Sequence, residues 1–199
     1  MTIIFFIKSS TIDIGKYTIK NIPGSSGRLD VISRCVLAAI LGDDNFEKDI
    51  HIYLFLERYG TFIFEPENLD FDIFPKNEIL FTDYFVEFLQ NYHFRKNQHL
   101  NPLDLVRTSK MSLIEAIKHF QKLNYRIFIL KEGGRDFLNL KNTIQKKDNI
   151  VFILGSQKDE FLDSKELGEL KIPIISIGSQ SYLASSVIRL LKLHLLALP

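Results

Sequence analysis

Apolar residues along the chain follow two alternating spacings. Short runs rich in β-branched and aromatic residues predict buried strands, and they occur at residues 3–7, 50–56, 125–130, 149–154 and 172–177. Apolar positions repeated every three or four residues predict helices, and they occur at residues 28–41, 80–92, 112–123, 164–170 and 182–196. Because the two patterns alternate, the chain is predicted to be an α/β protein. Its sheet should be mostly parallel and flanked by helices on both faces.

Local signals refine this outline. Ser112 and Glu115 have capping-box spacing, which predicts a helix that begins after Ser112. Residues 59–61 form a predicted turn that leads to a hairpin strand at 61–64, and residues 131–134 form another turn after a strand. Residues 65–76 and 93–110 are predicted to be irregular.

Composition limits the class of protein. The chain has 199 residues, 46% of them hydrophobic, which suits one domain with a substantial core. No apolar run approaches the ~20 residues that cross a membrane, and residues 1–8 resemble a first strand and not a signal peptide. The one cysteine, Cys35, forms no intrachain disulfide, which favours a reducing cytoplasm. It lies on an apolar helix face, as a core residue does. The net charge of +1 argues against a broadly basic nucleic-acid binder but allows a local site.

Residues 22–30, Ile-Pro-Gly-Ser-Ser-Gly-Arg-Leu-Asp, run directly into a predicted helix. Exposed amides at a helix N-terminus favour anions, and the guanidinium of Arg28 suits a phosphate group. The alternative is a capped turn in which Asp30 sits favourably in the first helical turn and Arg28 is solvated.

Three predicted strands end near glycine: Leu130 precedes Lys-Glu-Gly-Gly, Leu154 precedes Gly-Ser-Gln, and Ile177 precedes Gly-Ser-Gln-Ser. Ligands of open α/β sheets bind at the carboxyl ends of the strands, where glycine lets a flat ligand approach the backbone. The neighbouring aliphatic residues suit an adenine ring. The alternative is that these glycines only end strands. No dinucleotide-binding fingerprint, P-loop, nucleophile elbow or metal-ligand spacing is present, so no metal is expected.

The 22–30 block, followed by Arg34-Cys35-Val36, resembles the N-terminal signature of the archaeal tRNA pseudouridine-54 N1-methyltransferases, a family of the SPOUT superfamily. The resemblance continues, in order, at residues 129–136, 151–155, 175–178 and 183–185. It therefore covers nearly the whole chain, which would be a single SPOUT domain over residues 1–199 with a divergent insert around residues 66–110.

This resemblance implies a C-terminal trefoil knot, S-adenosylmethionine bound in a bent form within it, and a homodimer that acts on tRNA. The cofactor-binding residues it implies are Leu130, Gly155, Ser176, Ile177, Gly178 and Leu183. The sequence departs from the family at Ser156, Gln157 and Val187, to which no role is transferred.

A mechanism follows from the resemblance. Methyl transfer to N1 of pseudouridine requires an in-line nitrogen and loss of its proton, so positioning dominates. Asp30 is the candidate to accept that proton or orient the base, and Arg28 to hold phosphate or the base carbonyl, with Arg34 as a second RNA-binding residue. The base must leave its stack. Two alternatives remain open: a SPOUT enzyme for another RNA, such as ribosomal RNA pseudouridine, and a non-catalytic, dimeric RNA-binding paralogue.

Overall fold

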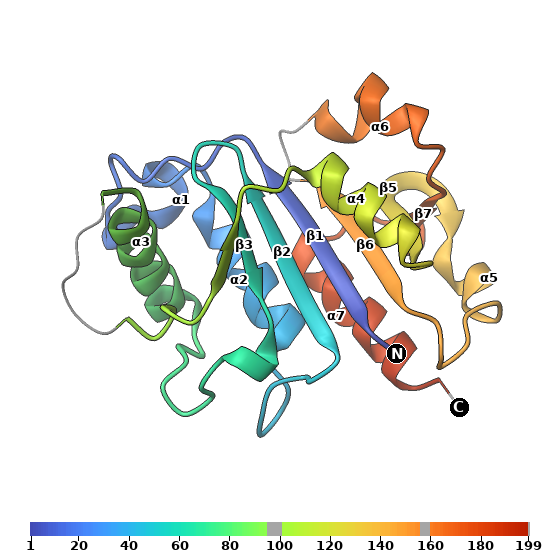
Figure 1. Ribbon diagram of the computed structural model, residues 1–199, viewed down its shortest axis with the longest axis horizontal. Coiled ribbons are helices and arrows are strands. Elements are labelled where there is room, and N and C mark those ends of the chain that lie inside the picture. The colour runs from blue at the N-terminus through green and yellow to red at the C-terminus, as the bar shows by residue number, and fades with distance from the viewer. Residues whose placement is uncertain (95–100, 156–159, 199) are drawn as a thin grey trace.

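The computed structural model describes residues 1–94, 101–155 and 160–198, and within them the strands form one sheet in the order β4-β3-β2-β1-β6-β5-β7 (Figure 1). The strands are β1 (Ile3–Ser9), β2 (Ile50–Leu56), β3 (Gly60–Phe64), β4 (Arg107–Ser109), β5 (Arg126–Asp136), β6 (Ile150–Gly155) and β7 (Ile174–Ser176). All neighbours from β2 to β7 pair in parallel, whereas β3 and β4 pair antiparallel at one edge. The predicted mostly parallel sheet and its hairpin are therefore confirmed.

The α-helices are α1 (Ile22–Ser25), α2 (Leu29–Ile40), α3 (Glu78–Phe94), α4 (Leu113–Lys122), α5 (Phe137–Lys141), α6 (Lys165–Glu169) and α7 (Ala184–Leu196). Short 3-10 helices span Ile19–Asn21, Pro66–Asn68 and Glu160–Asp163. The predicted capping box is confirmed: Ser112 Oγ accepts the Glu115 amide, and Glu115 accepts the Ser112 amide. No helix of the described chain is long and apolar enough to span a bilayer.

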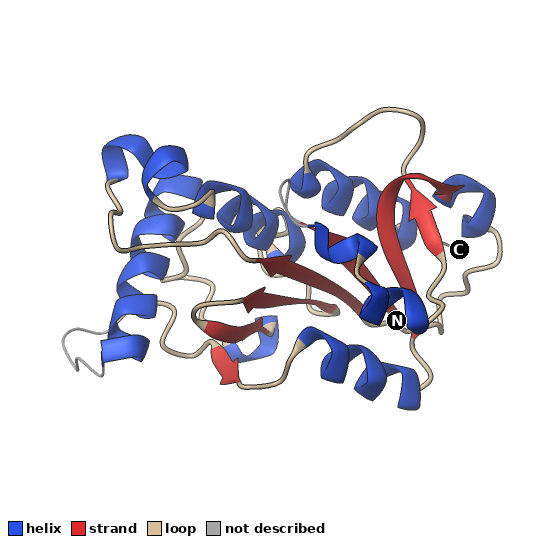
Figure 2. Cartoon of the chain, turned by 90° about the horizontal axis from the view of Figure 1, so that it is seen from above, coloured by secondary structure: helices blue, strands red, loops and turns tan. Residues whose placement is uncertain are grey.

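Helices cover both faces of the sheet (Figure 2). Ile3, Phe5 and Ile7 of β1 pack into one core cluster with residues of α2, α3 and α7, whereas Ile4 and Phe6 pack into a second cluster with α4 and α6. This alternation follows from the two-residue repeat of a strand. Because both faces of the strands are buried, the near-continuous apolar runs seen in the sequence are explained.

A buried lysine fixes α7 against α2. Lys192 Nζ donates to the carbonyl oxygens of Ala38 and Leu41, at 3.1 and 2.9 Å, and lies 3.7 Å from Glu47 Oε1. These carbonyls belong to the last turn and the C-cap of α2, where backbone acceptors lack partners within the helix. Burial lowers the pKa of Lys192, and the nearby Glu47 carboxylate opposes that shift.

The predicted turn at residues 131–134 is wrong, because β5 continues through these residues. Ile175 of β7 pairs with Leu130 and again with Arg135, and since a strand residue has one partner on each edge, β5 flanks both edges of β7. Figure 2 shows β5 as an arc around β7. Two consecutive glycines permit this path: Gly133 has a φ of 77°, and a Cβ on Gly134 would lie 2.6 Å from the Ile175 carbonyl carbon. We call residues 131–134 the β5 arch.

Two further elements differ from the sequence prediction. The short strand β4 lies in a segment predicted to be irregular. Its three residues carry no strand pattern of their own, and they are a strand because they pair with β3. The α1 turn occupies part of the glycine- and serine-rich block, where Asn21 Oδ1 accepts the Gly24 amide at 3.3 Å.

Candidate functional site

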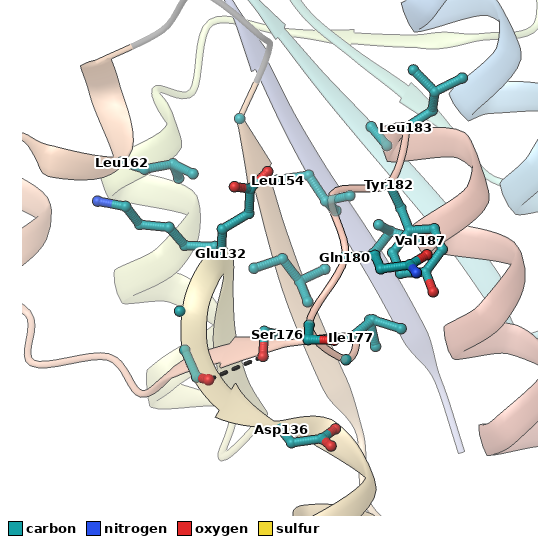
Figure 3. Close-up of a pocket in the computed structure, with 18 of the residues that line it drawn as sticks. Glu132, Asp136, Leu154, Leu162, Ser176, Ile177, Gln180, Tyr182, Leu183 and Val187 are labelled. Atoms are coloured by element: carbon teal, nitrogen blue, oxygen red, sulfur yellow. Dashed lines mark hydrogen bonds between the residues drawn. The ribbon is translucent and has the colours of Figure 1, made fainter.

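A cavity of about 960 Å³ opens beside the β5 arch and the ends of β6 and β7 (Figure 3). All six residues predicted for the cofactor lie on its wall: Leu130, Gly155, Ser176, Ile177, Gly178 and Leu183. The three places that the sequence singled out, at Leu130, Leu154 and Ile177, therefore meet at one cavity, as parallel topology requires, although β5 continues past Leu130. Their contacts with a ligand stay a prediction.

The cavity wall is mainly apolar and is completed by backbone. Leu154, Leu162, Ile177 and Val187 supply aliphatic surface, while residues 177–183 cross the opening as an irregular segment before α7. Gly178 has a φ of 70°, and a Cβ added to it would meet nothing within 4 Å, so its backbone is open to the cavity. Apolar walls with a few polar groups suit a planar ring with a polar edge.

The β5 arch forms one side of the cavity and is held by β7. Ser176 Oγ donates to the Gly134 carbonyl at 3.0 Å, and Asp136, which follows the arch, caps α5 by accepting the Leu138 amide at 3.0 Å. The arch residue Lys131 forms an ion pair with Asp163. These contacts fix the arch without filling the cavity.

A second polar cluster lies at the start of α2. Arg28 Nε donates to Asp30 Oδ1 at 3.1 Å, and Arg34 Nη2 donates to Asp30 Oδ2 at 2.6 Å. The Asp30 side chain is only 5% exposed, against 43% for Arg28. The hydrogen bond from Arg28 to Asp30, together with the negative charge of the Asp30 carboxylate, raises the pKa of Arg28. The structure thus brings together the three residues predicted for catalysis and RNA binding. Val31, which follows Asp30 in the chain, lines the cavity.

The glycine- and serine-rich block differs from the predicted open backbone. Ser26 Oγ accepts the Leu29 amide at 3.1 Å and donates to the Ile22 carbonyl at 2.5 Å. A Cβ on Gly27 would lie 1.7 Å from the Thr11 carbonyl oxygen, and its φ is 62°. The block is therefore a closed turn held by its own hydrogen bonds. It presents Arg28, which has a left-handed φ of 73°, rather than a row of free amides.

Several cavity residues were not singled out from the sequence. Glu132, Gln180 and Tyr182 line the cavity, although Glu132 stands in the Lys-Glu-Gly-Gly segment that signalled the strand end. Val187, a departure from the family pattern, also lines it. The other departures, Ser156 and Gln157, lie outside the described residues.

Titratable groups elsewhere form no comparable site. Within residues 1–94, 101–155 and 160–198, no group of three or more His, Cys, Asp or Glu side chains is arranged to hold a metal. His51 Nε2 lies 3.3 Å from Glu67 Oε2, as a surface pair. Burial raises the pKa of the Cys35 thiol to about 12, as befits a core residue.

Comparison with known proteins decides the family. The model of a family described as putative SAM-dependent RNA methyltransferases matches residues 2–198. The chain belongs to this family. The resemblance of its sequence motifs is thereby confirmed, and so is S-adenosylmethionine, the SAM of the family description, as the cofactor on which the family depends.

Curated relatives are similar over nearly the whole chain. A tRNA (pseudouridine(54)-N(1))-methyltransferase of Pyrococcus abyssi is 26% identical over 96% of this chain and 96% of its own length. The protein of the same name from Methanosarcina acetivorans is 28% identical over 89% of this chain and 82% of its own. The crystal structure of Archaeoglobus fulgidus Nep1 bound to S-adenosylhomocysteine superposes with a TM-score of 0.63 at 15% identity, covering 98% of this chain and 97% of that one. At that identity the last match supports the fold.

Proposed function

We propose that this protein is an S-adenosylmethionine-dependent methyltransferase that modifies N1 of pseudouridine at position 54 of tRNA. One observation carries the proposal. The cavity beside the β5 arch and the ends of β6 and β7 adjoins, through Val31, the Arg28–Asp30–Arg34 cluster, so that a cofactor site and a site for a polyanion share one border. The names of the curated relatives supply the base and its position.

The residues present fit the cofactor. A volume of about 960 Å³ is ample for a bent nucleoside with an amino-acid arm. We propose that the cofactor is held by Leu130, Gly155, Ser176, Ile177, Gly178 and Leu183. The apolar side chains pack against the adenine ring, and backbone amides and carbonyls form hydrogen bonds with its polar edge. When bound, S-adenosylmethionine supplies an electrophilic methyl group on a sulfonium.

The α2 cluster serves the RNA. Asp30 is buried between two guanidinium groups, so it fixes the direction in which Arg28 and Arg34 face an approaching phosphate or base carbonyl. We propose that Asp30, directly or through a water molecule, also receives the proton lost from N1. Binding requires the base to swing out of its stack toward Val31, which costs a few kcal/mol, about 2–4, and is compensated by these contacts.

Further parts of the proposal concern assembly. The chain functions as one domain over residues 1–199, with a divergent insert around residues 66–110, in the cytoplasm where tRNA is modified. The curved path of β5 around β7, which α7 follows in the chain, supports the trefoil knot. Leu193 and Leu196 of α7 are 64% and 46% exposed, which supports burial of this helix face in a homodimer.

The test is methylation in vitro followed by mass spectrometry of the nucleosides. The protein is incubated with methyl-labelled cofactor and with tRNA carrying pseudouridine or uridine at position 54. Uridine is the matched control, because its N1 is bonded to the ribose and has no proton to lose. We expect N1-methylpseudouridine only in the first tRNA. A parallel reaction contains ribosomal RNA, and methylation there but not of the tRNA would assign another target. Cofactor binding without transfer to any of these RNAs would indicate a non-catalytic RNA-binding protein.

A further inference from the structure

Three charged side chains line the cavity within the described part of the chain: Lys131, Glu132 and Asp136. Two of them are engaged elsewhere. Lys131 is paired with Asp163, and Asp136 Oδ1 accepts the Leu138 amide as the cap of α5. Glu132 has no hydrogen-bond or ion-pair partner among the residues that the structure describes, and nothing given by the family resemblance assigns it a role.

Glu132 is an exposed residue, and it stands at the border of the cavity. It stands on the β5 arch, whose flanking residues, Leu130 and Arg135, both pair with Ile175 of β7, and which is also held by the Ser176–Gly134 hydrogen bond. In Figure 3, Glu132 rises on the arch side of the cavity, with Gln180, Tyr182 and Val187 on the opposite side. A carboxylate held on a fixed loop at the border of an apolar cavity creates a negative potential inside it.

The charge of the cofactor changes during the reaction. S-adenosylmethionine carries a sulfonium cation, whereas the product S-adenosylhomocysteine is a neutral thioether at the same atom. Both keep the ammonium and carboxylate of the amino-acid arm. A fixed negative charge near the sulfur therefore interacts with the two molecules differently, while a contact to the adenine, the ribose or the arm does not.

We propose that Glu132 is the counter-ion of the cofactor sulfonium and makes the cavity bind S-adenosylmethionine more tightly than S-adenosylhomocysteine. This inference rests on the proposed function. Its consequence is directional: once the methyl group has left, the attraction is lost, and the neutral product exchanges for fresh cofactor. Because Glu132 is exposed, solvent screening limits the effect, and we expect it to raise the affinity for S-adenosylmethionine about tenfold, equivalent to about 1.4 kcal/mol.

The experiment is calorimetric titration of the purified full chain with S-adenosylmethionine, S-adenosylhomocysteine and methylthioadenosine, a neutral analogue without the amino-acid arm. Glu132→Gln should weaken S-adenosylmethionine about tenfold and the two neutral-sulfur ligands less than about twofold. Glu132→Lys should reverse the preference, so that S-adenosylhomocysteine binds more tightly. The matched control is Glu169→Gln on α6, which removes the same charge from an exposed residue outside the cavity and should change no affinity.

The outcomes separate two failures. Equal weakening of S-adenosylmethionine and S-adenosylhomocysteine by Glu132→Gln overturns the inference, since the side chain would then act on a group that both share. Unchanged affinities overturn it as well. If the wild-type protein binds none of the three ligands, the proposed function itself fails, whatever the variants do.

Discussion

Replacement of Gly134 by alanine tests how the cavity is held open. Gly134 lies on the β5 arch, and a Cβ there would be 2.6 Å from the Ile175 carbonyl carbon and 2.8 Å from both the Ile175 Cα and amide nitrogen. These neighbours are backbone atoms of a paired strand, so no side-chain rotation relieves the contact. Gly134 has no positive φ, and the effect of the substitution is therefore steric.

The expected magnitude follows from this contact. Overpacking a tight interior site costs about 1–3 kcal/mol, and we expect the upper end because the arch must move away from β7. The same movement strains the Ser176–Gly134 hydrogen bond and the second pairing of Ile175. For a chain of this size, about 3 kcal/mol lowers the melting temperature by about 6–12 °C. Since Leu130 precedes the arch and Ser176 is hydrogen-bonded to it, and both line the cavity, cofactor affinity should also fall.

Gly168→Ala is the matched control. Gly168 lies in α6, and nothing lies within 4 Å of its added Cβ, so alanine should be neutral or stabilise by about 0.5–1 kcal/mol. The assay is differential scanning calorimetry, with and without S-adenosylhomocysteine. If Gly134→Ala melts and binds like the wild type, the close approach of the arch to β7 does not hold the cavity, and the reasoning is refuted.

Three further outcomes are expected. Asp30→Asn should slow methyl transfer by about a hundredfold or more while S-adenosylhomocysteine still binds; a change below about threefold in single-turnover rates would exclude the role of Asp30. Lys192→Met leaves two α2 carbonyls without their donor and should cost about 1–3 kcal/mol in urea unfolding. Burial lowers the pKa of Lys192 from 10.5, so the unfolded chain binds the Lys192 proton more tightly than the folded protein does. The free energy of unfolding of the wild type should therefore rise as the pH increases from the lowered pKa to 10.5. The Lys192→Met variant should lack this rise. Cys35, with its pKa raised to about 12 by burial, should resist a disulfide reagent at pH 8 until the protein unfolds, whereas rapid labelling of the native protein would show that its helix face is open.

Much of the fold was predictable because its signals are local. The segments that form β1, β2 and β6 are buried on both faces and are therefore apolar at nearly every position. The side chains of Ser112 and Glu115 form the capping box that begins α4, so its start is visible in the sequence. The β5 arch was not predictable in this way. Two glycines ordinarily mark a turn, and here they permit a strand to continue only because β7, which comes much later in the chain, pairs with it on both sides.

The candidate site was likewise predictable only where its signals are local or follow from chain direction. The strand-end glycines and the block before α2 located the cavity and the Arg28–Asp30–Arg34 cluster, because chain direction alone brings parallel strand ends together. What the sequence did not disclose is which side chains are already engaged. That Lys131 is paired with Asp163, while Glu132 faces the cavity, depends on a residue of a distant 3-10 helix and on the path of the arch. The sequence likewise places Asp30 in the first turn of a helix, but it does not show that the Asp30 side chain is buried between two arginines.

A crystal structure of the protein grown with S-adenosylhomocysteine tests most directly whether this cavity is the cofactor site. We expect a bent ligand in the cavity, with its adenine between the backbone of Gly155 and Gly178 and its sulfur between Glu132 and Val31, the residue that follows Asp30. Density for the ligand at any other place, or a cavity closed by the protein's own side chains at saturating ligand, would contradict it.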